Sequence, residues 1–264
     1  MASGAQFTSL SSDFYAIPKA QVFFQLQGED AFRLLGDADE ITVEIAVEET
    51  ERFTNEEGIR QLAKTIVTQI DATLGMTLAQ LAPFVRALSL MGDLDTHTQT
   101  VATNYMMSFS NVIADGMIYQ LDHIRITPAS VTVQDGQVVP VPYVEGTNFK
   151  LDYDTGHIQI LSKPVGADTT LEVEYDAAAI LAAADVTKIG IGNNSSIRGA
   201  LVIRGTNEVG PRVELRLHDV QLRPNAARNF LAEADISTVE VIGRVFRDTS
   251  QAAGFELGFE RVIP

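Results

Sequence analysis

The sequence contains no cysteine and no tryptophan among its 264 residues. The absence of cysteine excludes disulfides, thiolate metal sites and cysteine nucleophiles, and it fits a protein that folds in a reducing cytoplasm. The absence of tryptophan removes the ring on which sugar ligands most readily stack. The remaining apolar content, 45% of the residues, is ordinary for a folded chain, so we expect a sizeable core.

Long apolar runs are also missing. The longest aliphatic run, Ala177 to Ala184, is too short to cross a bilayer. The first ten residues, MASGAQFTSL, lack the basic start and the apolar stretch of a signal peptide. We therefore expect a soluble chain that is not exported and has no membrane partner.

Basic residues are scarce, with 19 Lys and Arg against 35 Asp and Glu, a formal charge of −16. Residues 1–197 carry 26 acids and 10 bases, whereas residues 198–264 carry nine of each. Between residues 28 and 57 there are 11 acids and two bases. Stable DNA binding needs Lys and Arg to neutralise phosphates, so this charge argues against it. General solubility is the alternative explanation of the acidic charge.

No motif for catalysis or cofactor binding is present. The sequence has no G-x-S-x-G, no H-E-x-x-H and no phosphate-binding glycine loop that ends in Lys-Ser/Thr. The four histidines are far apart in the sequence. Asp152-x-Asp154-x-Gly156 resembles the start of a calcium loop but lacks the later Glu, and a hairpin turn explains it better. We expect no enzyme activity, no metal and no cofactor.

Two long alternating segments are the strongest structural signal. In DEITVEIAVEETERF (39–53), Ile41, Val43, Ile45 and Val47 alternate with polar residues, as in a half-buried strand. Its 15 residues would extend about 50 Å, so we expect it to project beyond its own domain. In KTIVTQIDATLGM (64–76), the alternation predicts one face with Ile66, Ile70, Ala72, Leu74 and Met76, and another with Thr65, Gln69, Asp71 and Thr73.

The pattern then changes to a helical period. Leu78, Leu81, Phe84, Val85 and Leu88 share one helix face. Thr77 is a plausible N-cap, and Gly92 lies near the expected end. Pro83 fits poorly because it would lie inside this helix.

Shorter strands follow. Turn signals separate six of them between residues 121 and 175, at Leu121–Thr127, Val131–Val133, Gln137–Val141, Phe149–Tyr153, Ile158–Leu161 and Leu171–Tyr175. Longer ones are expected at Arg198–Arg204, Arg212–Leu222, Ile236–Phe246 and Phe255–Val262. We predict a discontinuous core of residues 1–109 and 190–264, and an inserted, all-β module of residues 110–189.

The order of these segments resembles the major tail tube proteins of long-tailed, siphovirus-like bacteriophages. The resemblance covers somewhat more than half of the chain and depends on the order and spacing of Gly36–Gly58, Lys64–Leu88, Val213–Pro224 and Ile236–Asp248. It implies a mainly β fold, in which two packed antiparallel β-sheets form a sandwich with one flanking α-helix. The segments Tyr143–Leu161 and Thr170–Ala177 resemble a strand-and-hairpin insertion of various virion proteins. Residues 110–189 would then either lie on the exterior of the tube, as we expect, or extend its wall.

The same resemblance implies a structural subunit of the virion tail. Hexameric rings of the chain would be assembled in the host cytoplasm and would stack into a hollow tube. The partners would be other copies of the chain and other tail proteins at the tube ends. DNA would pass through the tube without specific binding.

Carboxylates that face the lumen of such a tube would repel DNA phosphates over about 8–10 Å, the Debye length in physiological salt. We expect five residues on the polar faces of the two long strands to face the lumen: Glu40, Glu44, Glu48, Gln69 and Asp71. A solvated outer face is the alternative position for them.

A second use of charge is contact between rings. Nine of the fourteen arginines follow residue 197. An acidic loop with Glu56 and Glu57 could meet Arg212 and Arg216 of the next ring, because complementary charge sets orientation and register. Pairing within the C-terminal sheet explains these arginines equally well.

Two other functions remain open at the level of sequence. Another virion ring protein, such as a tail terminator or a baseplate component, would share the sandwich but stop at one ring. A module that binds host glycans would need an aromatic platform, and only two tyrosines lie between residues 143 and 153.

Overall fold

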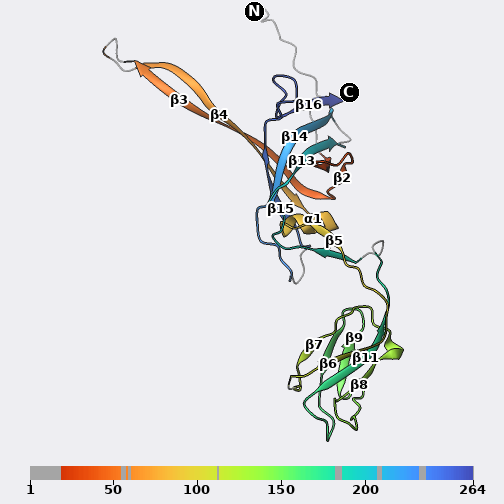
Figure 1. Ribbon diagram of the computed structural model, residues 1–264. Coiled ribbons are helices and arrows are strands. Elements are labelled where there is room, and N and C mark those ends of the chain that lie inside the picture. The colour runs from red at the N-terminus through yellow and green to blue at the C-terminus, as the bar shows by residue number, and fades with distance from the viewer. Residues whose placement is uncertain are drawn as a thin grey trace, which may run out of the picture. The chain divides into compact units, whose positions relative to one another are not determined.

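The computed structural model describes residues 19–54, 58, 61–111, 113–181, 186–206, 210–231 and 236–263. Over these residues the fold is mainly β, with several antiparallel sheets and a single α-helix (Figure 1). The expected fold class is thus confirmed. The chain separates into two compact units, Met1–Asp95 with Ile189–Pro264 (unit 1) and Thr96–Lys188 (unit 2).

Unit 1 is built on one eight-stranded antiparallel sheet. Its strand order is β2-β1-β13-β14-β15-β4-β3, and β16 also pairs with β14. The elements are β1 (Ala20–Leu26), β2 (Arg33–Leu34), β3 (Ala38–Thr54), β4 (Gln61–Leu78), α1 (Pro83–Ser89), β13 (Ile197–Gly205), β14 (Arg212–Pro224), β15 (Val239–Val245) and β16 (Gly258–Ile263).

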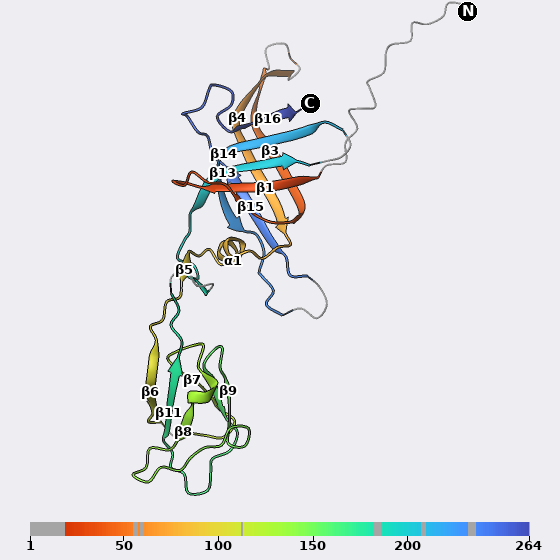
Figure 2. The same cartoon turned by 90° about the vertical axis from the view of Figure 1, so that its right-hand side faces the viewer.

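The sheet folds over itself to enclose its own core. Strand β14 pairs with β16 over Arg212–Leu217 and with β15 over Val220–Pro224. Figure 2 shows β1, β13 and β14 crossing the direction of β15, β4 and β3. The buried side chains of these strands and of α1 form one cluster, which includes Val22, Phe24, Leu74, Met76, Val85, Leu88, Leu201, Val220 and Val241. Two layers of a continuous sheet therefore cover a shared core, as in a sandwich.

Helix α1 begins later than the sequence period predicts. It spans Pro83–Ser89, with Pro83 in its first turn, where the missing N–H costs nothing. The expected N-cap, Thr77, lies instead in β4, which continues to Leu78. Leu78 and Leu88 both face the same core, and this explains why they fitted one helical face. The Gly92 amide donates a hydrogen bond to the Ala87 carbonyl, near the predicted end.

Two short strands lie in the connecting segments. Strands β5 (Leu94–Thr96) and β12 (Thr187–Ile189) form a two-stranded sheet. The first boundary of the inserted module was predicted at residue 110, but unit 2 begins at residue 96. The difference arises because β6 (Ala102–Phe109) pairs with β11 (Leu171–Ala177) of the module.

Unit 2 consists of two three-stranded antiparallel sheets, β6-β11-β8 and β7-β10-β9. Its other elements are β7 (Ile118–Gln120), the 3-10 helix η2 (Pro128–Ser130), β8 (Thr132–Gln134), β9 (Phe149–Asp152) and β10 (His157–Ile160). The two sheets share a core that includes Phe149, Ile158, Leu171, Val173 and the fully buried Tyr175. The hairpin predicted at Asp154–Gly156 is confirmed, because it joins the paired strands β9 and β10.

Two segments of unit 2 that were predicted as strands, Leu121–Thr127 and Gln137–Val141, are instead irregular. The second is held by Asp135, whose buried carboxylate accepts hydrogen bonds from the backbone N–H of Val141 at 2.7 Å and of Asp168 at 2.8 Å. Asp135 therefore anchors a loop rather than a tight hairpin.

Candidate functional site

The hairpin of β3 and β4 is the least enclosed element of unit 1. Strand β15 pairs with β4 over Ala72–Leu78, so among the described strands the preceding part of β4 pairs with β3 alone. We call Ala46–Thr54 and Gln61–Asp71 the outer arm. The 17 residues of β3 extend about 55 Å at the usual rise, and Figure 1 shows the arm leaving the core. The projection expected from the length of this strand is therefore present.

Cross-strand pairing assigns the side chains of the arm to two faces, because directly opposed residues point to the same side of a sheet. Glu40 pairs with Thr77, Glu44 with Thr73, Ala46 with Asp71 and Glu48 with Gln69. The five residues predicted to face a lumen, Glu40, Glu44, Glu48, Gln69 and Asp71, thus lie on one face. We call it the acidic face. Glu240 of β15 extends it, because Glu240 also pairs with Thr77.

The acidic face is solvated and has little internal neutralisation. The carboxylate of Asp71 lies 4.0 Å from the guanidinium of Arg244 and accepts a hydrogen bond of 2.6 Å from the Gln69 amide. Within the described part of the chain, Glu44 and Glu48 have no ion-pair partner. Exposed ion pairs such as Arg244–Asp71 contribute little stability. Stabilisation of the fold therefore does not explain why Glu44, Glu48 and Asp71 are acidic.

A bulge in β4 changes which side chains lie on each face, compared with the prediction from the sequence. Glu48 pairs with Gln69 but Glu49 pairs with Val67, so Thr68 is an extra residue in β4. Beyond this point the alternation is reversed. Ile66 therefore lies on the acidic face, and Thr65 lies on the opposite face, contrary to the simple period-two prediction.

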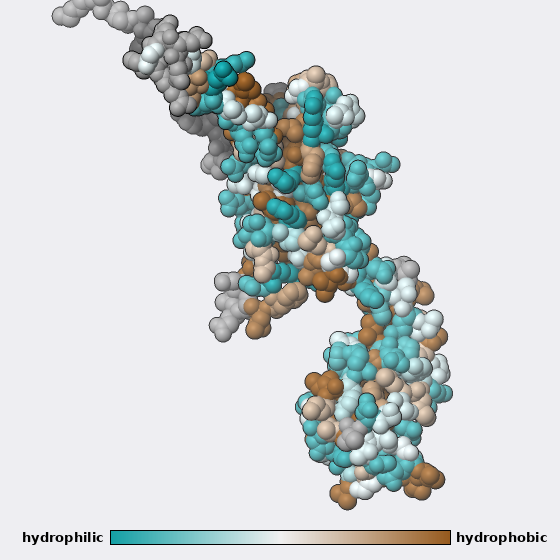
Figure 3. Space-filling model, turned by 60° about the vertical axis from the view of Figure 1, so that its left-hand side comes forward, coloured by the Kyte–Doolittle hydropathy of each residue, from teal (hydrophilic) through white to brown (hydrophobic). Residues whose placement is uncertain are grey.

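The opposite face of the arm carries exposed apolar side chains. Ile45 is 65% exposed and Ile70 is 55% exposed, although both lie on the face that forms the core nearer the base of β4. We call this set the apolar stripe: Val43, Ile45, Val47, Leu62, Val67 and Ile70. Figure 3 shows apolar side chains among hydrophilic ones on the surface of unit 1. Glu49 and Glu51 share this face of β3, so acidic residues lie between Val47 and the tip of the arm. Exposed apolar side chains that gather on a projecting element are typical of an interaction site.

Strand β3 also forms an edge of the sheet. Among the described strands it pairs only with β4. A long edge strand presents unpaired backbone N–H and C=O groups, and proteins usually protect such edges or use them to pair with another chain. The edge and the apolar stripe belong to the same element, so one partner could cover both.

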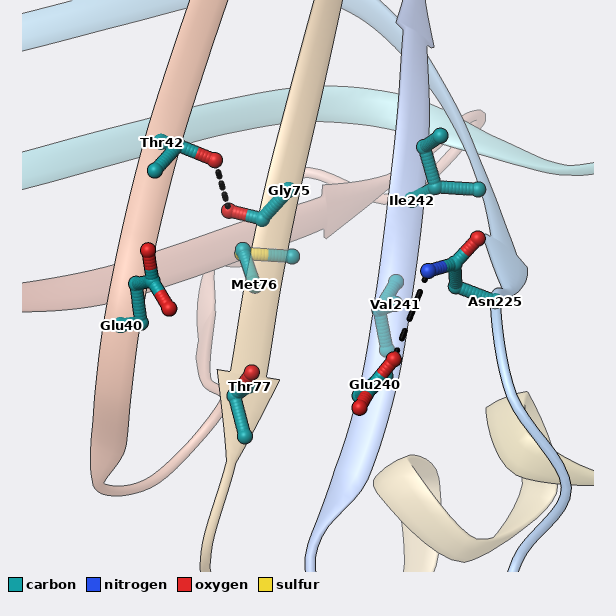
Figure 4. Close-up of a pocket in the computed structure, with 9 residues that line it drawn as sticks. All are labelled: Glu40, Thr42, Gly75, Met76, Thr77, Asn225, Glu240, Val241 and Ile242. Carbon is teal, nitrogen blue, oxygen red and sulfur yellow. Dashed lines mark hydrogen bonds between the residues drawn. The ribbon is translucent and has the colours of Figure 1, made fainter.

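A small hollow lies at the base of the acidic face, between β3, β4 and β15 (Figure 4). It encloses about 150 Å³, and Glu40, Thr77 and Glu240 line it. Gly75 helps to form the hollow, because a Cβ there would lie 2.7 Å from the Thr42 hydroxyl. The Asn225 amide donates a hydrogen bond of 3.4 Å to Glu240.

The structure describes two of the four residues that were predicted to form contacts between rings. Arg212 and Arg216 both lie on β14, and pairs of residues four apart share a strand face. Arg212 is exposed, whereas Arg216 is half-buried with its guanidinium 5.9 Å from the Phe32 ring. Glu56 and Glu57 lie outside the described residues, so their proximity to any arginine stays a prediction.

The outer arm holds one feature that sequence reasoning missed. Arg52 and Lys64 are directly opposite each other on the same face as Glu48 and Gln69. Counted from the core, the bulge at Thr68 determines that Lys64 opposes Arg52, and alternation alone does not reveal a bulge. Among the described residues, no cluster of three or more acids and histidines has a geometry that could hold a metal.

These features define a mainly β protein of two units with a projecting, two-faced hairpin. The family model described as "Protein of unknown function UCP028589" matches residues 21–261, and the chain belongs to this family. No curated protein matches the chain. The single α-helix of the described residues is too short and too polar to span a membrane.

Proposed function

We propose that the chain is a structural, non-enzymatic subunit of a bacteriophage tail tube. In this proposal, rings of the chain, which the resemblance implies to be hexamers, stack into a hollow tube in the virion tail. The observation that carries the proposal is the outer arm, because it combines an open sheet edge with an exposed apolar stripe. Both features are costly for an isolated chain and are removed when neighbouring copies cover them.

Closed rings suit this type of surface. A strand edge that pairs with a different edge of the next copy makes a heterologous contact, which closes into a ring when the rotation allows it. A β-sheet that continues from copy to copy has no free edge. The open edge of β3 supplies one side of such a contact in every copy.

The acidic face gives the tube its proposed channel. Glu40, Glu44, Glu48, Gln69 and Asp71 share one side of β3 and β4, opposite the apolar stripe. If the apolar stripe packs against neighbouring protein, the acidic face is left for water. DNA carries about one negative charge per 1.7 Å of its axis, and it would be repelled from a channel with this lining.

Negative-stain electron microscopy of the purified chain tests the proposal. We expect hollow tubes of variable length that grow with protein concentration. Single rings that do not stack would favour a tail terminator or a baseplate ring instead. Isolated particles of one chain at all concentrations would contradict the proposal.

A further inference from the structure

Two cations of the outer arm lie in an unfavourable position, directly opposite each other. Arg52 of β3 and Lys64 of β4 are direct cross-strand neighbours, and both side chains are exposed. No ion pair joins either of them to another described residue. Like charges opposite each other destabilise an antiparallel pair. An anionic partner from outside this part of the chain would remove the repulsion.

The base of the same two strands carries the complementary charge. Glu40 and Glu240 flank Thr77 on either side and line the hollow in Figure 4. Glu40 has no ion-pair partner among the described residues, and the 3.4 Å hydrogen bond from Asn225 is the one polar contact found there for the Glu240 carboxylate. A guanidinium has five N–H donors in a fixed plane, and a hollow edged by two carboxylates and a hydroxyl offers acceptors for several of them.

The cationic pair lies on the outer arm, and the anionic pair lies at the base of the β3–β4 hairpin, where β15 joins it. Arg52 follows Glu40 by 12 residues on β3, about 40 Å along an extended strand. Figure 1 shows the outer arm pointing away from the end of unit 1 that holds α1, and Figure 4 shows the hollow close to that helix. Different, complementary surfaces at two ends of one molecule favour head-to-tail stacking.

The twist of the β3–β4 ribbon turns Arg52 and Lys64 away from the direction in which the acidic residues nearer the core point. Two-stranded ribbons twist more than wide sheets, and each bulge increases the local twist. The outer arm is a two-stranded ribbon with two bulges. Arg52 and Lys64 can therefore point toward a neighbouring ring while Glu44 and Asp71, nearer the core, face another direction.

We propose that the outer arm of one copy reaches the base of β3, β4 and β15 in a copy of the adjacent ring, where Arg52 and Lys64 pair with Glu40 and Glu240. This inference rests on the proposed function, and it assigns the contact between stacked rings. It differs from the expected contact of Glu56 and Glu57 with Arg212 and Arg216. Glu40 then marks the end of the acidic face, at the junction of two rings.

Charge reversal of either side tests the contact. The variant Arg52→Glu/Lys64→Glu has anionic groups at both ends, and the variant Glu40→Lys/Glu240→Lys has cationic groups at both ends. We expect each variant to form rings but no tubes. When separately purified rings of the two variants are mixed, each anionic tip meets a cationic base and the tubes return. Electron microscopy and sedimentation measure the loss and the recovery.

A matched control separates this contact from a general effect of charge. Lys19 and Arg204 are exposed residues of unit 1 away from the arm, and Lys19→Glu/Arg204→Glu makes the same change in net charge as reversal of Arg52 and Lys64. We expect tubes of normal length from this control.

Three results would overturn the inference. Normal tubes from either arm or base variant would show that the contact is not needed. Folded variant rings that fail to form tubes on mixing would show that the two sites are not partners. Loss of tubes in the control would assign the effect to net charge. In all three cases wild-type tubes leave the proposed function intact, whereas an absence of wild-type tubes overturns both.

Discussion

At the scale of single residues, Asp135 shows how one carboxylate organises two loops of unit 2. Its oxygens accept hydrogen bonds from the amides of Val141 and Asp168 and from the side chain of Gln137. Burial alone raises the pKa of the Asp135 carboxyl, but these hydrogen bonds outweigh it, and the pKa is lowered from its ordinary 3.8. The charged form is therefore favoured by the folded state.

We predict that Asp135→Ala lowers the free energy of unfolding of unit 2 by about 2–3 kcal/mol, because it leaves two backbone N–H groups without acceptors. Five of the six tyrosines lie between residues 105 and 175, so near-UV circular dichroism in urea reports on this unit. Asp154→Asn, a change of the same charge at an exposed site, is the control. An Asp135→Ala variant as stable as this control would contradict the prediction.

The same carboxylate predicts a dependence on pH. A folded-state pKa below the unfolded value means that the unfolded state binds more protons, so the stabilisation is complete above pH 3.8 and is lost as the pH falls through the folded-state pKa. The difference in unfolding free energy between the wild type and Asp135→Asn should therefore shrink below pH 3.8. A constant difference down to the lowest pH at which unit 2 folds would disagree with this account.

The residues of β3, β4 and α1 show which features could be predicted from the sequence and which could not. Alternation correctly placed Glu40, Glu44, Glu48 and Asp71 on one face, because a period of two is a property of every extended strand. It failed at Ile66 and Thr65, because the extra residue Thr68 depends on pairing with Glu48 and Glu49. Pro83 was a signal in the sequence that the helix begins there, at its first turn, rather than at Leu78.

At the scale of elements, the arm combines a buried and an exposed half on one strand face. Leu74 is fully buried and Ile70, four residues earlier on β4, is 55% exposed. The sequence shows the same alternation in both halves. Only the pairing with β15, which stops at Ala72, determines which half is covered within the chain.

This contrast gives a prediction for the apolar stripe. Leu74→Ala should lower the free energy of unfolding by about 2–5 kcal/mol, because it opens a cavity in the core. Ile70→Ala should change the stability of the isolated chain by less than about 0.5 kcal/mol, since the side chain is largely in water. If neighbours cover the stripe, Ile70→Ala combined with Ile45→Ala should raise the protein concentration needed for assembly.

Urea unfolding of the dispersed chain and light scattering during assembly measure these two effects. The account would be wrong if the double variant Ile45→Ala/Ile70→Ala assembled at the same concentration as the wild type. A large loss of stability in the dispersed Ile70→Ala chain would also contradict it, because the stripe would then be part of the core of unit 1.

At the scale of the whole molecule, the order of the segments predicted the fold class and the interruption of unit 1 by unit 2. It predicted the boundary between the two units less well. The β6 segment, ATNYMMSF, has little alternation, and it belongs to unit 2 through its pairing with β11. The burial pattern of β11 alternates throughout, and this strand was predicted. A single sequence does not show which strands pair when they are far apart along the chain.

The proposed channel gives a prediction at this scale. Glu44→Lys, Glu48→Lys and Asp71→Lys together reverse the charge of the acidic face. Tubes should still form, because these side chains lie opposite the apolar stripe. DNA release from particles with the variant tube should be slower, because the lysines attract phosphates. Release at the wild-type rate from ordered variant tubes would exclude the acidic face as the lining.

The proposed function requires that the isolated chain is incomplete, because neighbouring copies must cover the edge of β3 and the apolar stripe. Sedimentation velocity of the purified protein over increasing concentration tests it most directly. We expect a slow species of one chain to give way to rings and to larger, heterogeneous assemblies as the concentration rises. A single species with the mass of one chain, 28.7 kDa, at every concentration would contradict it.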